Sequence, residues 1–165
     1  MNKEIKMKKG FFYPNDFWLS SAYLGLNKSA RDLLQCLVTE ISKVKRMGKW
    51  VEINNGKLSF SEISYKALTG RCSSTYLNAR NELIKRGIIE MTHRGGGGAG
   101  DRSMYKILFG IKSMPKGNEK WRRYPKENWG KDIPKSKGMT IGIKTRWKKG
   151  QSGRKVISHP NEVYP

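Results

Sequence analysis

The stretch that most constrains the fold is residues 59–109, where two helical patterns, the turn between them and a glycine-tipped pair of strand patterns follow without a gap. The first helix is predicted over residues 61–68. Ser59 and Glu62 have the S-x-x-E spacing of a capping box, in which each side chain bonds a free backbone N–H at a helix start. Gly70 predicts the end of this helix, because glycine adopts a left-handed C-cap conformation at little steric cost. The residues expected to be buried are Phe60, Ile63 and Ala67.

A second helix is predicted over residues 73–86, because Cys72, Ser73, Ser74 and Thr75 supply N-cap candidates just before it. Tyr76, Ala79 and Leu83 recur at the spacing of one helical face, which we expect to enter the core. The opposite side would then present Ser73, Ser74, Leu77, Asn78 and Asn81. An asparagine amide can bond the edge of adenine bidentately, so Asn78 and Asn81 are the favoured base-reading residues, with plain solvation of both as the alternative.

Two short runs rich in strand-forming residues follow, residues 88–94 and 103–109, and they predict a hairpin. The glycine-rich residues 95–101 lie between them. A nucleotide-binding loop would lead from a strand into a helix and carry Gly-Lys-Ser/Thr, and neither feature is present. A hairpin tip flanked by Arg94 and Arg102 is therefore the interpretation, with both arginines placed to contact phosphates or a minor groove.

Upstream, a long amphipathic helix is predicted over residues 30–45, with an apolar stripe that runs from Leu33 to Val44. A strand over 49–53, a turn at Asn54-Asn55-Gly56 and a short paired segment at Lys57-Leu58 should follow. The aromatic run at residues 11–14 is expected to pack in the core rather than to stack on bases.

The charge balance points to a polyanionic partner. The chain has 34 basic and 13 acidic residues, a net charge of +21 over 165 residues. Residues 1–110 carry 19 basic and 9 acidic residues (+10), and residues 111–165 carry 15 and 4 (+11). The last third is thus about twice as dense in charge, which makes it a second candidate contact surface.

Several function classes are disfavoured by what the sequence contains. There is no apolar run of membrane-spanning length and no signal-peptide pattern, so we expect a cytoplasmic, nucleoid-associated protein without membrane contact. Cys36 and Cys72 do not form a C-x-x-C pair and are expected to be reduced thiols. His93 and His159 lack acidic partners at metal-ligand spacing. We therefore expect no metal, no cofactor and no catalytic residue.

Beyond residue 110 the helical and strand periodicity fades while Pro, Gly, Lys and Trp become frequent, which predicts a basic extended arm over residues 111–165. Trp121 and Trp129 are expected to pack back on the preceding domain. Arg146, Trp147, Lys148 and Lys149 form the densest basic cluster and could contact a phosphate backbone, a minor groove or unpaired bases. The predicted organisation is a basic segment at 1–10, a folded domain at 11–110 and this arm.

Residues 58–63, Thr69-Gly70, Ser73-Ser74-Thr75, 79–89 and 100–107 together resemble the winged-helix proteins of phages, plasmids and related mobile elements. The N-terminal domains of phage replication initiators are the better-known members. The resemblance covers about residues 11–110 and extends loosely to 119–124. It implies an α+β winged helix-turn-helix, with a three-helix core and a β-hairpin wing. Three positions depart from the family pattern, namely Cys72, Leu77 and Arg80.

The resulting hypothesis is a non-enzymatic protein that binds double-stranded DNA at a replication origin or operator. The expected DNA contacts are Arg71, Ser73, Ser74, Thr75, Asn78, Asn81, Arg94, Arg102, Arg146, Trp147, Lys148 and Lys149. The alternatives are an RNA-binding or ribonucleoprotein component that uses the wing and arm, and a factor that binds a host replication or regulatory protein. A homodimer is also left open.

Overall fold

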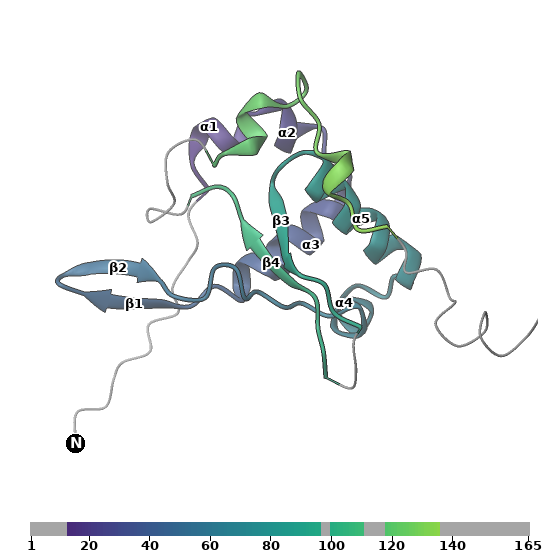
Figure 1. Cartoon of the computed structure of the whole chain (residues 1–165), viewed down its shortest axis with the longest axis horizontal. Coiled ribbons are helices and arrows are strands. Elements are labelled where there is room, and N and C mark those ends of the chain that lie inside the picture. Colours follow the sequence, from purple (N-terminus) through teal and green to yellow (C-terminus); the bar gives the residue numbers. More distant parts are fainter. Residues whose placement is uncertain (1–12, 97–99, 111–117, 136–165) are drawn as a thin grey trace, which may run out of the picture. The chain divides into compact units, whose positions relative to one another are not determined.

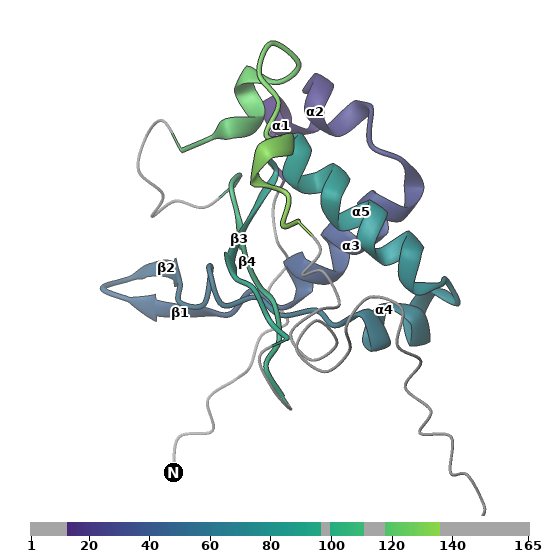
Figure 2. The same ribbon diagram turned by 45° about the vertical axis from the view of Figure 1, so that its right-hand side comes forward.

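A computed structural model describes residues 13–96, 100–110 and 118–135 of the chain. This part is an α+β structure with five α-helices and two small antiparallel sheets, each of two strands (Figures 1 and 2). The α+β class predicted from the sequence is therefore confirmed. Among the described residues, no helix has the length and apolar composition needed to cross a membrane.

The first three helices are α1 (Asn15–Trp18), α2 (Ser21–Leu24) and α3 (Lys28–Thr39). Asn27 caps α3 by accepting a hydrogen bond from the Ala30 amide at 2.8 Å. The prediction of a helix over residues 30–45 was too long, because α3 ends at Thr39. The Asn54 side chain bonds the Glu40 carbonyl and the Ser42 amide, each at 2.7 Å, and so occupies backbone groups that a longer helix would need.

Strands β1 (Lys43–Arg46) and β2 (Lys49–Glu52) form the first sheet. Val44, predicted to belong to the helical stripe, lies instead in β1 opposite Val51 of β2. The strand and turn predicted after residue 49 are confirmed. In both ribbon views this hairpin projects away from the helices (Figures 1 and 2).

Helices α4 (Glu62–Thr69) and α5 (Ser73–Lys85) are joined by a short turn. The predicted capping box is wrong: Ser61, not Ser59, is the N-cap, and its side chain accepts a bond from the Ser64 amide at 3.0 Å. The predicted buried face of α4 is also wrong. Tyr65 is fully buried, and its hydroxyl donates to the Ser29 carbonyl of α3 at 3.0 Å, so the Tyr65 side of α4 faces the core. Ile63 is 81% exposed and Ala67 is also exposed, because both lie on the other side of the helix.

The second hairpin consists of β3 (Ile89–His93) and β4 (Met104–Ile107), as predicted, with a register shift between Met91 and His93. Leu58 pairs with Tyr105 of β4 in an isolated bridge, which confirms the predicted paired segment at Lys57-Leu58. Tyr105 and Ile107 are buried, so β4 contributes one face to the core.

The core lies between α3, α5 and the β3–β4 hairpin, and α1 and α2 close one end of it. Tyr76, Ala79 and Leu83 of α5 are buried as the helical spacing predicted. Phe17 stacks on Phe109 with ring centroids 3.7 Å apart. Tyr13 packs against both rings, which agrees with core packing for the aromatic run; Phe11 and Phe12 lie outside the described residues.

Residues 118–135, assigned to an extended arm by the sequence, pack on the domain instead. They include two short 3₁₀ helices, η1 (Lys120–Arg123) and η2 (Gly130–Asp132). Trp121 is 2% exposed and its indole N–H donates to the Leu108 carbonyl at 2.9 Å, and the Trp129 amide donates to the Lys85 carbonyl at 2.9 Å. The packing predicted for these two tryptophans is thus confirmed, while the arm boundary at residue 111 was placed too early.

Candidate nucleic-acid interface

The turn between α4 and α5 is fixed by the backbone and by one ion pair. Gly70 has φ of 70°, the left-handed conformation predicted for it, and its amide bonds the Lys66 carbonyl at 2.8 Å. Arg71 follows, and its guanidinium lies 2.9 Å from the Asp32 carboxylate of α3 and 3.2 Å from the Tyr65 hydroxyl. Arg71 was predicted to contact DNA, but these contacts join the turn to the helical core. We therefore treat it as a positioning residue.

The outer face of α5 carries the side chains predicted to face a groove. Ser73, Ser74 and Asn78 are exposed, and Leu77 is 39% exposed. Within the described part of the chain, the Asn78 amide makes no hydrogen bond to another residue. Its donor and acceptor are both available to an external group, which is what a bidentate contact with a base edge requires.

Asn81 differs from Asn78 although the sequence treated them alike. Its side-chain oxygen accepts bonds from the Arg80 Nε and Nη2 atoms, at 3.2 and 2.9 Å. A bidentate contact with adenine would need that oxygen, so it would first have to displace Arg80. Asn78 is consequently the stronger base-reading candidate of the two.

At the start of α5, Cys72 occupies the N-cap position without making a side-chain cap bond to the backbone. Its sulfur lies 3.1 Å from the Ser74 hydroxyl and 3.2 Å from the Thr75 hydroxyl. These two contacts lower the pKa of the exposed Cys72 thiol to about 6, the Ser74 bond contributing most. Ser74 and Thr75 were predicted to contact DNA, and the structure places their hydroxyls on this sulfur. Cys36 is also a free thiol, but it is buried, and burial raises its pKa.

Arg94 directly follows β3 and Arg102 lies two residues before β4, so the two arginines flank the loop of the β3–β4 hairpin. Both are exposed, and neither forms an ion pair with the residues that the structure describes. Near its tip, His93 Nε2 lies 2.6 Å from Asp101 Oδ1. This pairing was not anticipated from the sequence, because the two residues come together only when the hairpin closes. Gly95 is required there, since a Cβ atom would meet the Ser103 backbone nitrogen at 2.5 Å.

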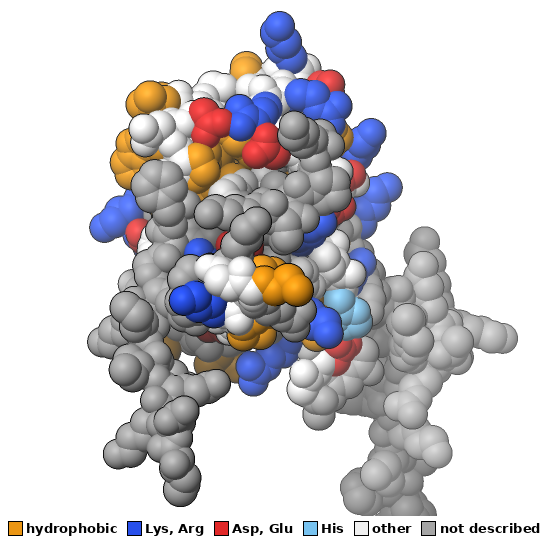
Figure 3. Space-filling model, turned by 90° about the vertical axis from the view of Figure 1, so that its left-hand side faces the viewer, with side chains coloured by type: hydrophobic (Ala, Val, Ile, Leu, Met, Phe, Trp, Pro, Cys, Tyr) orange, Lys and Arg blue, Asp and Glu red, His pale blue; other side chains and the backbone are white. Residues whose placement is uncertain are grey.

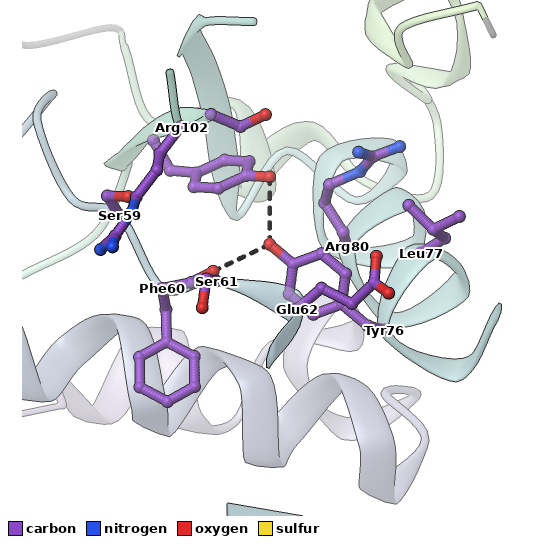
Figure 4. A pocket seen from close by; sticks show the side chains of 10 residues that line it. Ser59, Phe60, Ser61, Glu62, Tyr76, Leu77, Arg80 and Arg102 are labelled. Atoms are coloured by element: carbon purple, nitrogen blue, oxygen red, sulfur yellow. Dashed lines mark hydrogen bonds between the residues drawn. The ribbon is translucent and has the colours of Figure 1, made fainter. Parts of the chain in front are cut away.

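A pocket of about 200 Å³ opens between the N-terminus of α4, the outer side of α5 and strand β4 (Figure 4). Arg80 lines it on the α5 side and Arg102 on the β4 side, as Figure 4 shows. The Tyr76 hydroxyl forms part of its lining and donates to the Phe60 carbonyl at 2.9 Å. Burial, followed by the neighbouring Tyr105, raises the pKa of Tyr76, so this phenol stays neutral. This pocket was not predicted from the sequence, because its lining comes from three separate segments.

The pocket has a mixed charge. Glu62 contributes a carboxylate to the same lining as the two arginines. The Ser59 hydroxyl is buried and has no hydrogen-bond partner among the described residues. Two cations against one anion make the space between α5 and β4 suited to a phosphate oxygen more than to a cationic ligand.

No group of three or more His, Cys, Asp or Glu side chains suited to a metal ion occurs within residues 13–96, 100–110 and 118–135. The predicted contacts at Arg146, Trp147, Lys148 and Lys149 lie outside the described residues. Comparison with protein-family models, with curated proteins and with solved structures finds no match for the chain.

Proposed function

We propose that this chain is a non-enzymatic double-stranded DNA-binding protein with a winged helix-turn-helix domain, acting at a replication origin or operator of a mobile element. On this proposal α5 is the recognition helix and the β3–β4 hairpin is the wing. Helices α3, α4 and α5 correspond to the three-helix core. The basic C-terminal residues, including 146–149, add affinity that depends on salt.

The observation that carries the proposal is the outer face of α5 beside the β3–β4 hairpin. One side of α5 is buried through Tyr76, Ala79 and Leu83, which leaves the polar side with Ser73 and Asn78 in solvent. A helix with this division can enter a major groove while its other face stays packed. The net charge of +21 supplies the attraction to a phosphate backbone.

The arginines of the wing supply the second part of the proposal. Arg94 and Arg102 are exposed on the two sides of the loop that joins β3 to β4. Phosphate contacts orient a protein on the duplex and carry no sequence information, while base contacts specify the site. Arg94 and Arg102 are therefore assigned to backbone contacts and Asn78 to base recognition.

The test is a salt-series titration of the full chain on duplex DNA, comparing the unmodified protein with the double variant Arg94→Gln/Arg102→Gln. Each phosphate contact contributes about 0.9 to the slope of log affinity against log salt, so the slope should fall by about two. Lys126→Gln/Lys131→Gln is the matched control, because it removes the same charge from exposed positions on the η1–η2 segment. Equal slopes for the two double variants would refute the assignment of the wing.

A further inference from the structure

The pocket between α4, α5 and β4 is lined by charged side chains that do not neutralise one another. Elsewhere several arginines pair with carboxylates, namely Arg71, Arg86, Arg122 and Arg123. Figure 3 shows one face of the molecule on which red acidic side chains lie beside blue basic ones. In the pocket, by contrast, no ion pair among the described residues joins Glu62 to Arg80 or Arg102, although all three line the same space. The lining therefore keeps an excess positive charge.

Arg80 is held beside the pocket by its neighbour on α5. Its Nε and Nη2 atoms donate to the Asn81 side-chain oxygen at 3.2 and 2.9 Å. The Nη1 atom makes no bond to another described residue, so its N–H groups are available to a ligand. Burial and Tyr105 raise the pKa of Tyr76 most, while Arg80 lowers it and Glu62 raises it, which indicates that both charges lie near this phenol in the lining.

A buried donor lies on the other side of the pocket. The Ser59 hydroxyl is buried and has no hydrogen-bond partner among the described residues, and Ser59 belongs to the lining. Figure 4 shows Ser59 next to Arg102, across the pocket from Arg80. A buried hydroxyl without a partner destabilises the folded protein, so a ligand oxygen that accepts its hydrogen bond would remove this cost.

The size of the pocket limits what can occupy it. Its volume is about 200 Å³, which is below the range of about 300–1,000 Å³ that is usual for drug-sized ligands. Two guanidinium groups and a hydroxyl donor suit a small anion with several acceptor oxygens, because charge-assisted bonds from arginine to phosphate are short and strong. Glu62 opposes such an anion with one charge against the two of the arginines. A phosphoryl group therefore fits both the size and the charge of this space.

We propose that this pocket is a phosphoryl-binding site, in which Arg80 and Arg102 bind the anionic oxygens, Ser59 donates a hydrogen bond and Asn81 is a positioning residue that holds Arg80. The inference goes beyond the proposed function, because the phosphoryl group can belong to the backbone of a duplex or to a free phosphate ester. Both sources present the same anionic oxygens to the arginines, and binding experiments separate them.

The site is tested by titrating the isotope-labelled full chain with inorganic phosphate, against sodium chloride at equal ionic strength, while NMR follows the amide signals of Ser59, Arg80 and Arg102. These signals should shift in a saturable way. Arg80→Gln should weaken phosphate binding about tenfold, as expected for loss of one charged hydrogen-bond donor, and the matched control Lys126→Gln, an exposed position, should not. Glu62→Gln should strengthen binding, because it removes the opposing charge. No saturable shift, or equal binding by Arg80→Gln and Lys126→Gln, would overturn the site.

Asn81→Ala tests the positioning role, because it removes the bonds to Arg80 and no charge. It should weaken phosphate binding and leave the preference among duplex sequences unchanged. Unchanged phosphate affinity in a variant whose amide spectrum shows a folded chain would refute the role of Asn81.

The source of the phosphoryl group is tested by repeating the phosphate titration with saturating duplex DNA. If the pocket binds the duplex backbone, the duplex should block the phosphate shifts, and Arg80→Gln should lower the salt slope of duplex binding by about one relative to Lys126→Gln. If the pocket binds a free phosphate ester, the shifts should persist and the two slopes should agree. Phosphate binding by a chain that does not bind duplex DNA would refute the proposed function and retain the pocket.

Discussion

The inner faces of α4 and α5 carry residues that the packing of the core explains, and the outer faces carry residues that it does not explain. On the inner face Tyr65, Tyr76 and Leu83 are at most 6% exposed, and the two phenol hydroxyls bond backbone carbonyls. On the outer face Ile63 is 81% exposed and Leu68 68%, and the Asn78 amide faces solvent. Packing accounts for the inner face. The outer face carries side chains that folding does not require, which is why we assign it to binding.

The largest expected effect is on the free energy of unfolding, which should fall for a substitution on the inner face and change little for one on the outer face. Leu83→Ala removes a fully buried side chain and should lower the free energy of unfolding by about 2–5 kcal/mol, through lost burial and the cavity left behind. Ile63→Ala on the outer face should change it by less than about 0.5 kcal/mol. Urea denaturation of the two variants measures the difference. Similar losses for both would mean that Ile63 is buried against something in solution and that the comparison of faces is mistaken.

Next in size is the effect of the two outer asparagines on discrimination among duplex sequences. Asn78→Ala should reduce the preference for a selected site over a site changed at one base pair by about 1–3 kcal/mol, as expected for loss of one bidentate contact. Asn81→Ala should leave that preference unchanged, because Arg80 already bonds the Asn81 oxygen. Competition binding with paired duplexes measures both. A larger effect at Asn81 would reverse the assignment.

The sequence predicted best what depends on neighbouring residues. The Gly70 turn, the buried positions of α5 and the β3–β4 hairpin all follow from short-range spacing and turn chemistry. Asn78 was identified in the same way, from its place opposite Tyr76, Ala79 and Leu83. The sequence therefore predicted which face of α5 is exposed, and the contact of that face with DNA stays a prediction.

The errors share a different origin, namely contacts between residues distant in the chain. Helix α3 ends early because Asn54 bonds the backbone at Glu40 and Ser42. Residues 118–135 lie on the domain because the Trp121 indole bonds the Leu108 carbonyl and the Trp129 amide bonds the Lys85 carbonyl. No local pattern indicates such partners, so the sequence analysis made α3 too long and placed residues 118–135 in an arm.

The turn between α4 and α5 should be sensitive to substitution of Gly70. Gly70→Ala places a Cβ atom in the left-handed region, where L-residues are disfavoured by about 1–2 kcal/mol. Gly70→Asn should lose less stability, because asparagine tolerates that region better. Urea denaturation distinguishes the two variants. Equal stability of all three proteins would show that the turn adopts another conformation.

The smallest expected effect is a difference in reactivity between the two thiols, which leaves the fold unchanged. The thiolate is the reactive form, so the exposed Cys72, with its pKa lowered to about 6, should react with iodoacetamide readily at pH 7. Its rate should fall about tenfold per pH unit below pH 6 as the sulfur is protonated. Buried Cys36, whose pKa is raised, should react slowly throughout. Mass spectrometry of peptides from the timed reaction follows both thiols, and a faster Cys36 would contradict the burial pattern.

The most direct test of the account is competition for the full chain between duplex DNA, single-stranded DNA and structured RNA at matched salt. If the outer face of α5 binds a major groove, duplex DNA should compete best, and Asn78→Ala should weaken that preference for a selected duplex. Stronger competition by RNA or single strands, unaffected by Asn78→Ala, would contradict the account and would assign binding to the basic charge rather than to α5.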